Sequence, residues 1–96
     1  MIEIRKTGAF DKWFHGLKDM QARSRVNVRI RRLSLRNMGD VKPAGGGVSE
    51  LRIDYGPGYR IYFVLHGKAE AILLGGGDKQ SQARDIAAAK RLAKEI

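Results

Sequence analysis

The sequence predicts a small α+β protein in which a mostly antiparallel sheet is backed by helices, in the order β-α-α-β-β-β-α. Two patterns support this class. Apolar residues recur at helical spacing in three segments, and in others they alternate with polar residues, as in half-buried strands. With 96 residues, the chain is expected to form one domain spanning residues 1–96, because two separate cores would each bury too little apolar surface.

The N-terminal third predicts a short strand followed by two helices. Residues 1–6 alternate apolar and charged side chains, and Thr7 is a suitable N-cap for the helix that follows. That helix has an apolar face formed by Phe10, Trp13, Phe14 and Leu17. Asp19 can cap a longer helix, whose apolar stripe is Ala22, Val26, Ile30 and Leu33. A link this short predicts an antiparallel helical hairpin.

The rest of the chain predicts three strands and a final helix. Residues 37–47 are rich in glycine and are predicted to form a mobile loop, and strands are predicted at 49–55, 59–65 and 69–74. Their register places Leu51, Ile53, Ile61 and Phe63 on the core side, and it places Arg52, Asp54, Arg60 and Tyr62 on the other side. After three glycines, Asp78 or Ser81 is predicted to cap a helix that ends near Lys94.

The charge of the chain predicts a polyanionic partner. Nineteen Lys and Arg residues against ten Asp and Glu residues give a net charge of +9, of which +7 belongs to residues 1–42. Neutralising phosphates releases counterions and drives the binding of nucleic acid, so RNA or the ribosome is the favoured partner. A protein with an acidic surface is the alternative.

Other features exclude whole classes of protein. No apolar run is long enough for a membrane span, and the N-terminus has no signal-peptide pattern, so a soluble cytoplasmic protein is expected. The chain has no cysteine, and no cluster has metal-ligand spacing, so neither a metal nor another cofactor is expected. The glycines before Lys79 do not match a phosphate-binding loop, and His15 and His66 are expected to be ordinary surface residues.

Two groups of residues could contact RNA. The first is an arginine stripe along the second helix, formed by Arg25, Arg29, Arg32 and Arg36. Arginine grips phosphate through a planar fork of donors, although such a stripe can also be a solvated helix face. The second is the polar side of the first hairpin, where Arg52, Arg60 and Tyr62 accompany Tyr55 and Tyr59 at the turn. Bases stack on tyrosine in single-stranded RNA complexes, but the residues alone favour cross-strand ion pairs of Arg52 or Arg60 with Asp54 or Glu50 as the explanation of these charges.

Two blocks of sequence carry a family resemblance. They run from Glu50 to Phe63 (ELRI, then GPGYRIYF) and from Leu73 to Ile86 (LLGGGDKQSQ, then DI). The chain resembles the HigB-type, phage Gp49-like branch of the RelE/ParE toxin superfamily, also called addiction-module killer proteins. The resemblance implies a RelE-like fold, ribosome-dependent cleavage of mRNA, and a partner antitoxin that is usually a small helix-turn-helix protein.

The resemblance also implies catalytic residues. Arg60 matches the arginine that binds the scissile phosphate, Arg52 falls near the basic residues that activate the 2′-hydroxyl or stabilise charge, and Lys79 occupies a basic position before the last helix. Where RelE-type enzymes carry two lysines close together on this strand, the chain has only Arg52, and it lacks their tyrosine early in the last helix, which leaves the general base unassigned. Two other functions stay open: a ParE-like inhibitor that binds DNA gyrase without catalysis, and a basic RNA-binding module. Three converging cations favour the ribonuclease.

Overall fold

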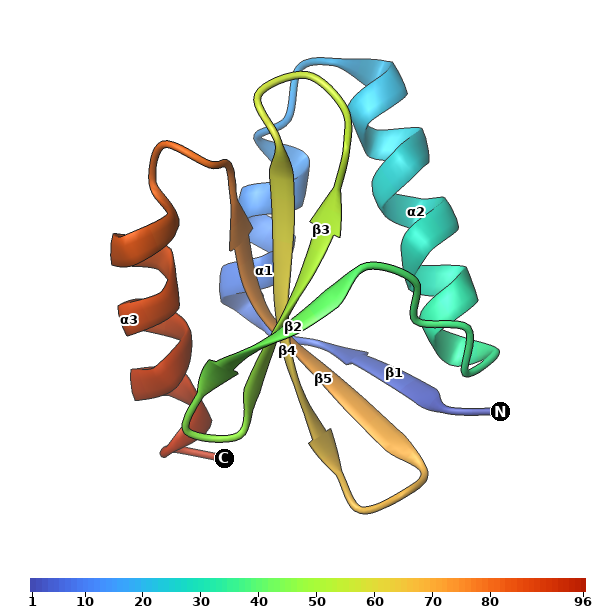
Figure 1. The fold of residues 1–96 in the computed structure, drawn as a ribbon, viewed down its shortest axis with the longest axis vertical. Coiled ribbons are helices and arrows are strands. Elements are labelled where there is room, and N and C mark those ends of the chain that lie inside the picture. The colour runs from blue at the N-terminus through green and yellow to red at the C-terminus, as the bar shows by residue number, and fades with distance from the viewer.

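The structure, a computed structural model that describes residues 1–96, confirms the predicted α+β class (Figure 1). It contains three helices and one five-stranded sheet. In chain order the elements are β1 (Glu3–Lys6), α1 (Gly8–His15), α2 (Met20–Ser34), β2 (Val41–Gly45), β3 (Val48–Ile53), β4 (Tyr59–His66), β5 (Glu70–Gly77) and α3 (Gln82–Ala93). None of the helices has the length and apolar composition needed to cross a membrane.

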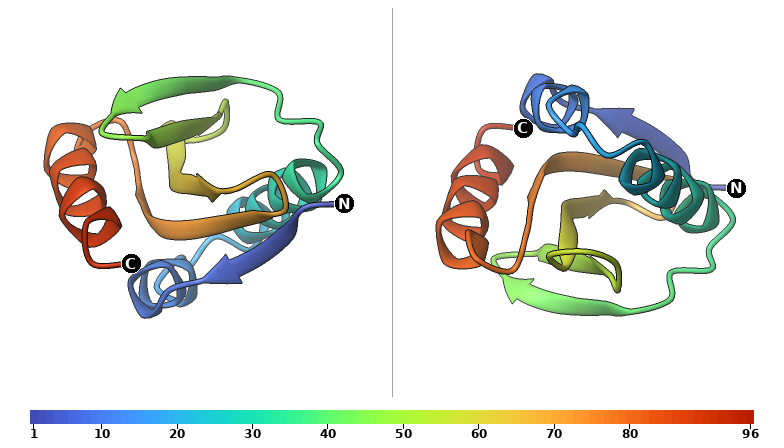
Figure 2. Two further views of the ribbon diagram at one scale, coloured as in Figure 1. Left: turned by 90° about the horizontal axis from the view of Figure 1, so that it is seen from below. Right: turned by 90° about the horizontal axis from the view of Figure 1, so that it is seen from above.

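The sheet is mostly antiparallel, with the strand order β1-β5-β4-β3-β2. Only β1 and β5 pair in parallel, and the long stretch of chain between them provides the crossover that a parallel pair requires. The predicted register of β3 against β4 is confirmed, since Leu51 lies opposite Ile61 and Ser49 lies opposite Phe63. The view along the strands shows α3 on one side of the strongly twisted sheet, with α1 and α2 on the other (Figure 2).

The prediction that residues 37–47 form a loop is wrong in part, because β2 lies within that segment. Val41 pairs with Leu51 and Lys42 pairs with Glu50, so β2 forms an edge of the sheet. Pro43 is tolerated there because an edge strand leaves one side of its backbone without a partner. The three glycines that end the segment have positive φ and form the tight turn into β3.

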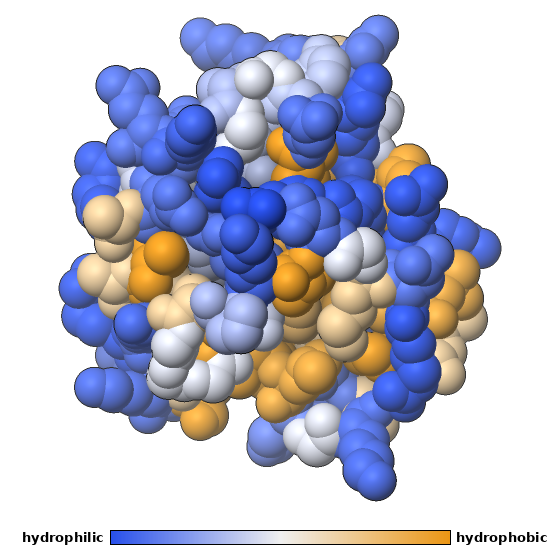
Figure 3. Space-filling model, viewed as in Figure 1, coloured by the Kyte–Doolittle hydropathy of each residue, from blue (hydrophilic) through white to orange (hydrophobic).

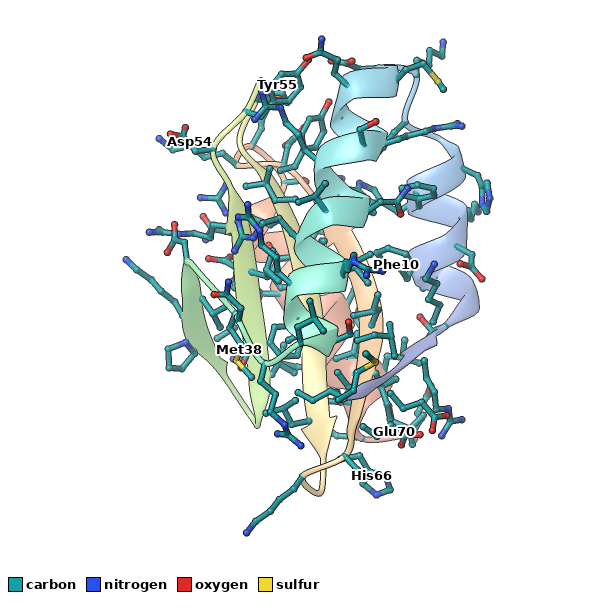
Figure 4. The ribbon with its side chains drawn as sticks, turned by 90° about the vertical axis from the view of Figure 1, so that its right-hand side faces the viewer. Phe10, Met38, Asp54, Tyr55, His66 and Glu70 are labelled. Carbon is teal, nitrogen blue, oxygen red and sulfur yellow. The ribbon has the colours of Figure 1, made fainter.

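The predicted helix starts are confirmed for α1 and α2. The Thr7 hydroxyl accepts a hydrogen bond from the Phe10 amide (3.2 Å), and the Asp19 carboxylate accepts one from the Gln21 amide (2.9 Å). Before α3, Asp78 accepts hydrogen bonds from the Gln80 and Ser81 amides. Each of these side chains satisfies backbone donors that have no partner within the helix. Helices α1 and α2 run side by side in opposite directions (Figure 4), as predicted.

Both faces of the sheet are covered, which the sequence did not predict. The core residues Leu51, Ile53, Ile61 and Phe63 lie under α1 and α2, as expected. The opposite face carries a second apolar cluster against α3, formed by Val48, Tyr62, Ile72, Leu74 and Ala89. The expectation that Tyr62 lies on an open polar face is therefore wrong, because its side chain is fully buried. We exclude Tyr62 from the surfaces considered for RNA stacking.

Candidate functional site

Three predicted site residues line one surface hollow of about 400 Å³, named here the cation hollow. Arg52 in β3 lies directly opposite Arg60 in β4, so the two side chains share a face of the sheet. Lys79 follows the end of β5 by two residues. A Cβ atom on Gly58 would lie 3.1 Å from Arg60 Nη1 and 3.5 Å from Lys79 Cβ, so these two side chains are near neighbours. The fold thus gathers the three cations.

Arg60 is the most buried of the three cations, with 8% of its surface exposed. Its Nη1 donates a hydrogen bond to the Gly58 carbonyl (2.6 Å), and its Nε lies 3.5 Å from a carboxylate oxygen of Glu50. Nη2 makes no hydrogen bond within the protein, and Nε is the one buried side-chain nitrogen without a hydrogen-bond partner. Arg60 is therefore held in one orientation, with Nη2 free to bind an anion.

Glu50 in β3 anchors this arrangement from the same face of the sheet as Arg60, and 4% of its surface is exposed. Besides Arg60, its carboxylate accepts hydrogen bonds from the Gln82 amide group (2.7 Å) and the Tyr62 hydroxyl (3.3 Å). Burial, with a contribution from the negative charge of Glu50, raises the pKa of Tyr62 well above its usual value, so Tyr62 remains a donor. A buried charge needs such partners, and helix α3 supplies one of them. Of the ion pairs considered from the sequence, Glu50–Arg60 is the one that forms.

Arg52 pairs with Asp40, which also lines the cation hollow. Arg52 Nε and Nη2 lie 3.2 and 3.3 Å from the two oxygens of the Asp40 carboxylate. The backbone amide of Arg52 donates to the Asp40 carbonyl as well, which fixes the segment before β2 against β3. Lys79 differs from both arginines. Its backbone amide donates to the Pro57 carbonyl, whereas its exposed side chain makes no ion pair.

A second hollow of about 490 Å³, named here the helix groove, lies between α2 and the end of β3. Arg25, Arg29 and Arg32 line it, and it shares Ile53 and Asp54 with the cation hollow. Arg29 is half-buried and donates to the backbone carbonyls of Arg52 and Met38. Burial and the nearby charge of Arg32 lower the pKa of Arg29. Arg29 thus connects α2 to the backbone of β3 and of the segment before β2, whereas Arg25 and Arg32 remain exposed.

The predicted four-membered stripe is wrong at its last member. Helix α2 ends at Ser34, and Arg36 lies beyond it with a φ of 65°. Its guanidinium donates to the carbonyl of Lys68, in the turn between β4 and β5. Arg36 therefore points away from the helix groove, at the other end of the helix.

The two turn tyrosines lie in the β3–β4 hairpin, and Tyr55 contacts the N-terminal end of α2 through Asp19 and Arg25. Tyr55 donates a hydrogen bond from its hydroxyl to Asp19 (2.8 Å), which lowers the pKa of Asp19 and raises that of Tyr55. The Arg25 guanidinium lies 4.4 Å from the Tyr55 ring centre, and Tyr59 stacks beside Tyr55 at 6.5 Å. Both tyrosines are half-buried, so each keeps part of its ring surface accessible.

The turn end of the β3–β4 hairpin is the most polar part of this surface. Hydrophilic residues cover much of the upper half of the face seen in Figure 3, where the hairpin turn lies, and apolar residues lie mostly in the lower half.

From the sequence, no role in the site was assigned to the carboxylates Asp40, Asp54 and Glu50. Alternation alone places Glu50 on the face of Arg52, but no local pattern identifies Asp40 as a partner.

Comparison with known proteins agrees with the sequence blocks noted above. The family model described as "Phage derived protein Gp49-like" matches residues 12–95. The chain is also 46% identical over 95 residues to an uncharacterized protein of Haemophilus influenzae, an alignment that covers 99% of this chain and 96% of that relative. The chain therefore belongs to the phage-derived Gp49-like protein family.

Proposed function

We propose that this protein is the toxin of a toxin–antitoxin pair and cleaves mRNA on the ribosome. The observation that carries the proposal is the convergence of Arg52, Arg60 and Lys79 on one hollow. A binding protein could use a basic surface anywhere, but three cations around one point suit a single phosphate that gains charge during a reaction. Membership of the Gp49-like family supports the toxin assignment. The partner antitoxin is proposed to be a helix-turn-helix protein.

The proposed chemistry is attack by the RNA 2′-hydroxyl on the adjacent phosphorus. Arg60 is proposed to bind the scissile phosphate through its free Nη2. Arg52 would balance the charge that develops on the phosphoryl oxygens, and Lys79 would stabilise or protonate the departing 5′-oxygen. The helix groove, which adjoins the cation hollow, would hold the flanking RNA or ribosomal RNA through Arg25 and Arg32.

The decisive test compares mRNA cleavage with DNA supercoiling. Purified protein is incubated with programmed ribosomes and with mRNA alone, and in a separate reaction with gyrase and relaxed plasmid. We expect cleavage of mRNA in the ribosomal A site, slow or no cleavage of free mRNA, and normal supercoiling. Intact mRNA with inhibited supercoiling would replace this proposal with the gyrase-binding function.

Lys79→Ala is expected to slow single-turnover cleavage on saturating ribosomes by about 10-fold, or ~1.4 kcal/mol, with little loss of ribosome binding. The effect is modest because the Lys79 side chain is exposed, so solvent screens its charge. Lys79→Arg should restore cleavage if only charge is needed, and should restore little if a proton is donated. Wild-type cleavage by Lys79→Ala would remove Lys79 from the site.

Arg25→Glu combined with Arg32→Glu is expected to weaken ribosome association and flatten its salt dependence by roughly one counterion per lost phosphate contact. Co-sedimentation with ribosomes across a salt series measures both effects. Arg31→Glu with Lys12→Glu is the matched control, because both residues are exposed and neither lines the groove. Equal behaviour of the two double variants would make the arginines of α2 a solvated surface.

A further inference from the structure

The cation hollow contains one carboxylate that forms no ion pair with any of its three cations. Three carboxylates lie in or beside the hollow, and two of them are committed to an arginine: Asp40 to Arg52, and the buried Glu50 to Arg60. The third, Asp54, is exposed and makes no hydrogen bond or ion pair within the protein. Figure 4 shows its side chain projecting outward from the end of β3, away from α2.

Asp54 lies where β3 ends and the hairpin turn begins. It follows Ile53, the last residue of β3, and the chain turns there, since the Tyr55 amide donates a hydrogen bond to the Ile53 carbonyl. Asp54 lines both the cation hollow and the helix groove. A strand of RNA passing from the groove to the hollow would therefore meet this carboxylate beside the phosphate-binding cations.

We infer that Asp54 is the general base of the proposed ribonuclease, an inference that rests on the proposed function. The reaction needs an acceptor for the 2′-hydroxyl proton, and neither Arg52 nor Arg60 can serve, because arginine stays protonated in proteins. Lys79, if it acts as the acid, cannot also be the base in the same step. A carboxylate with no bound partner is the remaining side chain in the hollow with the chemistry to accept a proton.

The step balances without any further reagent. As the 2′-oxygen bonds to phosphorus, its proton passes to Asp54. The bond from phosphorus to the 5′-oxygen breaks, and that oxygen takes a proton from Lys79 or water. The products are a 2′,3′-cyclic phosphate and a 5′-hydroxyl, and proton exchange with solvent returns Asp54 and Lys79 to their starting states.

The test is Asp54→Asn, assayed by single-turnover cleavage of ribosome-bound mRNA. We expect a loss of at least about 100-fold, the lower end of a general base's contribution, with ribosome binding unchanged or tighter because a negative charge is removed. A merely solvated Asp54 predicts the opposite trend: removing its charge near RNA would leave cleavage equal or faster. That result, with an active wild-type protein, would overturn the inference and leave the proposed function standing. An inactive wild-type protein would instead overturn the proposed function.

Two further measurements separate catalysis from structure. Formate or imidazole should restore cleavage to Asp54→Ala, with rates that rise with the basicity of the added base, whereas a structural defect would not respond. Asp40→Asn should cost less than Asp54→Asn, because its amide oxygen still accepts from Arg52. A larger loss in Asp40→Asn, or no rescue of Asp54→Ala by any added base, would contradict the assignment of Asp54.

Discussion

Arg60→Ala is expected to reduce mRNA cleavage by about 100–1,000-fold and to destabilise the protein at the same time. The rate loss is that of removing one preorganised contact to developing charge. The stability loss arises because Glu50 would keep its buried charge without its cation, which typically costs about 3–5 kcal/mol. From the sequence alone, this substitution would be expected to spare the fold, and the Glu50–Arg60 pair changes that expectation.

A double variant separates these two effects. Glu50→Gln combined with Arg60→Met removes both buried charges, and the new amide can still accept from Gln82 and Tyr62, which donate to Glu50 in the native protein. Replacing both members of a buried pair is often neutral for stability, so this protein should unfold near the wild-type denaturant concentration and still fail to cleave mRNA. A stable double variant that cleaves at the wild-type rate would show that Arg60 has no catalytic role.

Gly76→Ala is expected to destabilise the protein by about 1–3 kcal/mol through overpacking. A Cβ atom at position 76 would lie 2.3 Å from Cε3 and 2.4 Å from Cδ2 of Trp13, whose indole ring packs against β5 at this point. The ring cannot simply move aside, because Phe10 and Tyr59 lie against it. Urea denaturation measures the change, and the fluorescence of Trp13, the one tryptophan, reports its displacement.

The adjacent Gly75→Ala is the matched control. Nothing lies within 4 Å of a Cβ atom at position 75, so the substitution should change stability by no more than about 0.5 kcal/mol. Equal urea midpoints for the two variants would mean that β5 shifts readily under α1, and the packing explanation for Gly76 would then be wrong.

The sequence predicted the helices and strands well where a side chain interacts with residues close to it in the chain. Thr7 and Asp19 cap helices through backbone amides two or three residues away, so sequence spacing was enough to place both helix starts. The register of β3 and β4 followed from alternation around a three-residue turn. The glycines and the proline around Pro43 predicted a loop, but an edge strand also tolerates these residues. Only the pairing with β3 identifies this segment as the strand β2.

Burial on the second face of the sheet was harder to predict. Alternation assigns Tyr62 and Arg60 to one side of β4, but it does not say whether a helix covers that side. Helix α3 packs over that side of the sheet and buries Tyr62. Glu50, buried on the same side, accepts a hydrogen bond from Tyr62 and pairs with Arg60. The family blocks contain the three cations of the candidate site, so these could be predicted from the sequence. The pairing of Asp40 with Arg52 and the burial of Glu50 could not, because both depend on contacts between distant segments.

The contact between Gln82 and Glu50 also has a consequence for how the protein is made. The cation hollow is lined by Asp40, which precedes β2, by the two arginines of β3 and β4, and by Lys79, which follows β5. Gln82 of α3 donates a hydrogen bond to Glu50, which in turn pairs with Arg60. These contacts join segments between Asp40 and Gln82, so they form only after the chain has been made as far as α3. A nascent chain that has not reached Gln82 lacks this anchor, so the ribosome that produces this protein would not encounter the complete site before α3 has been synthesised.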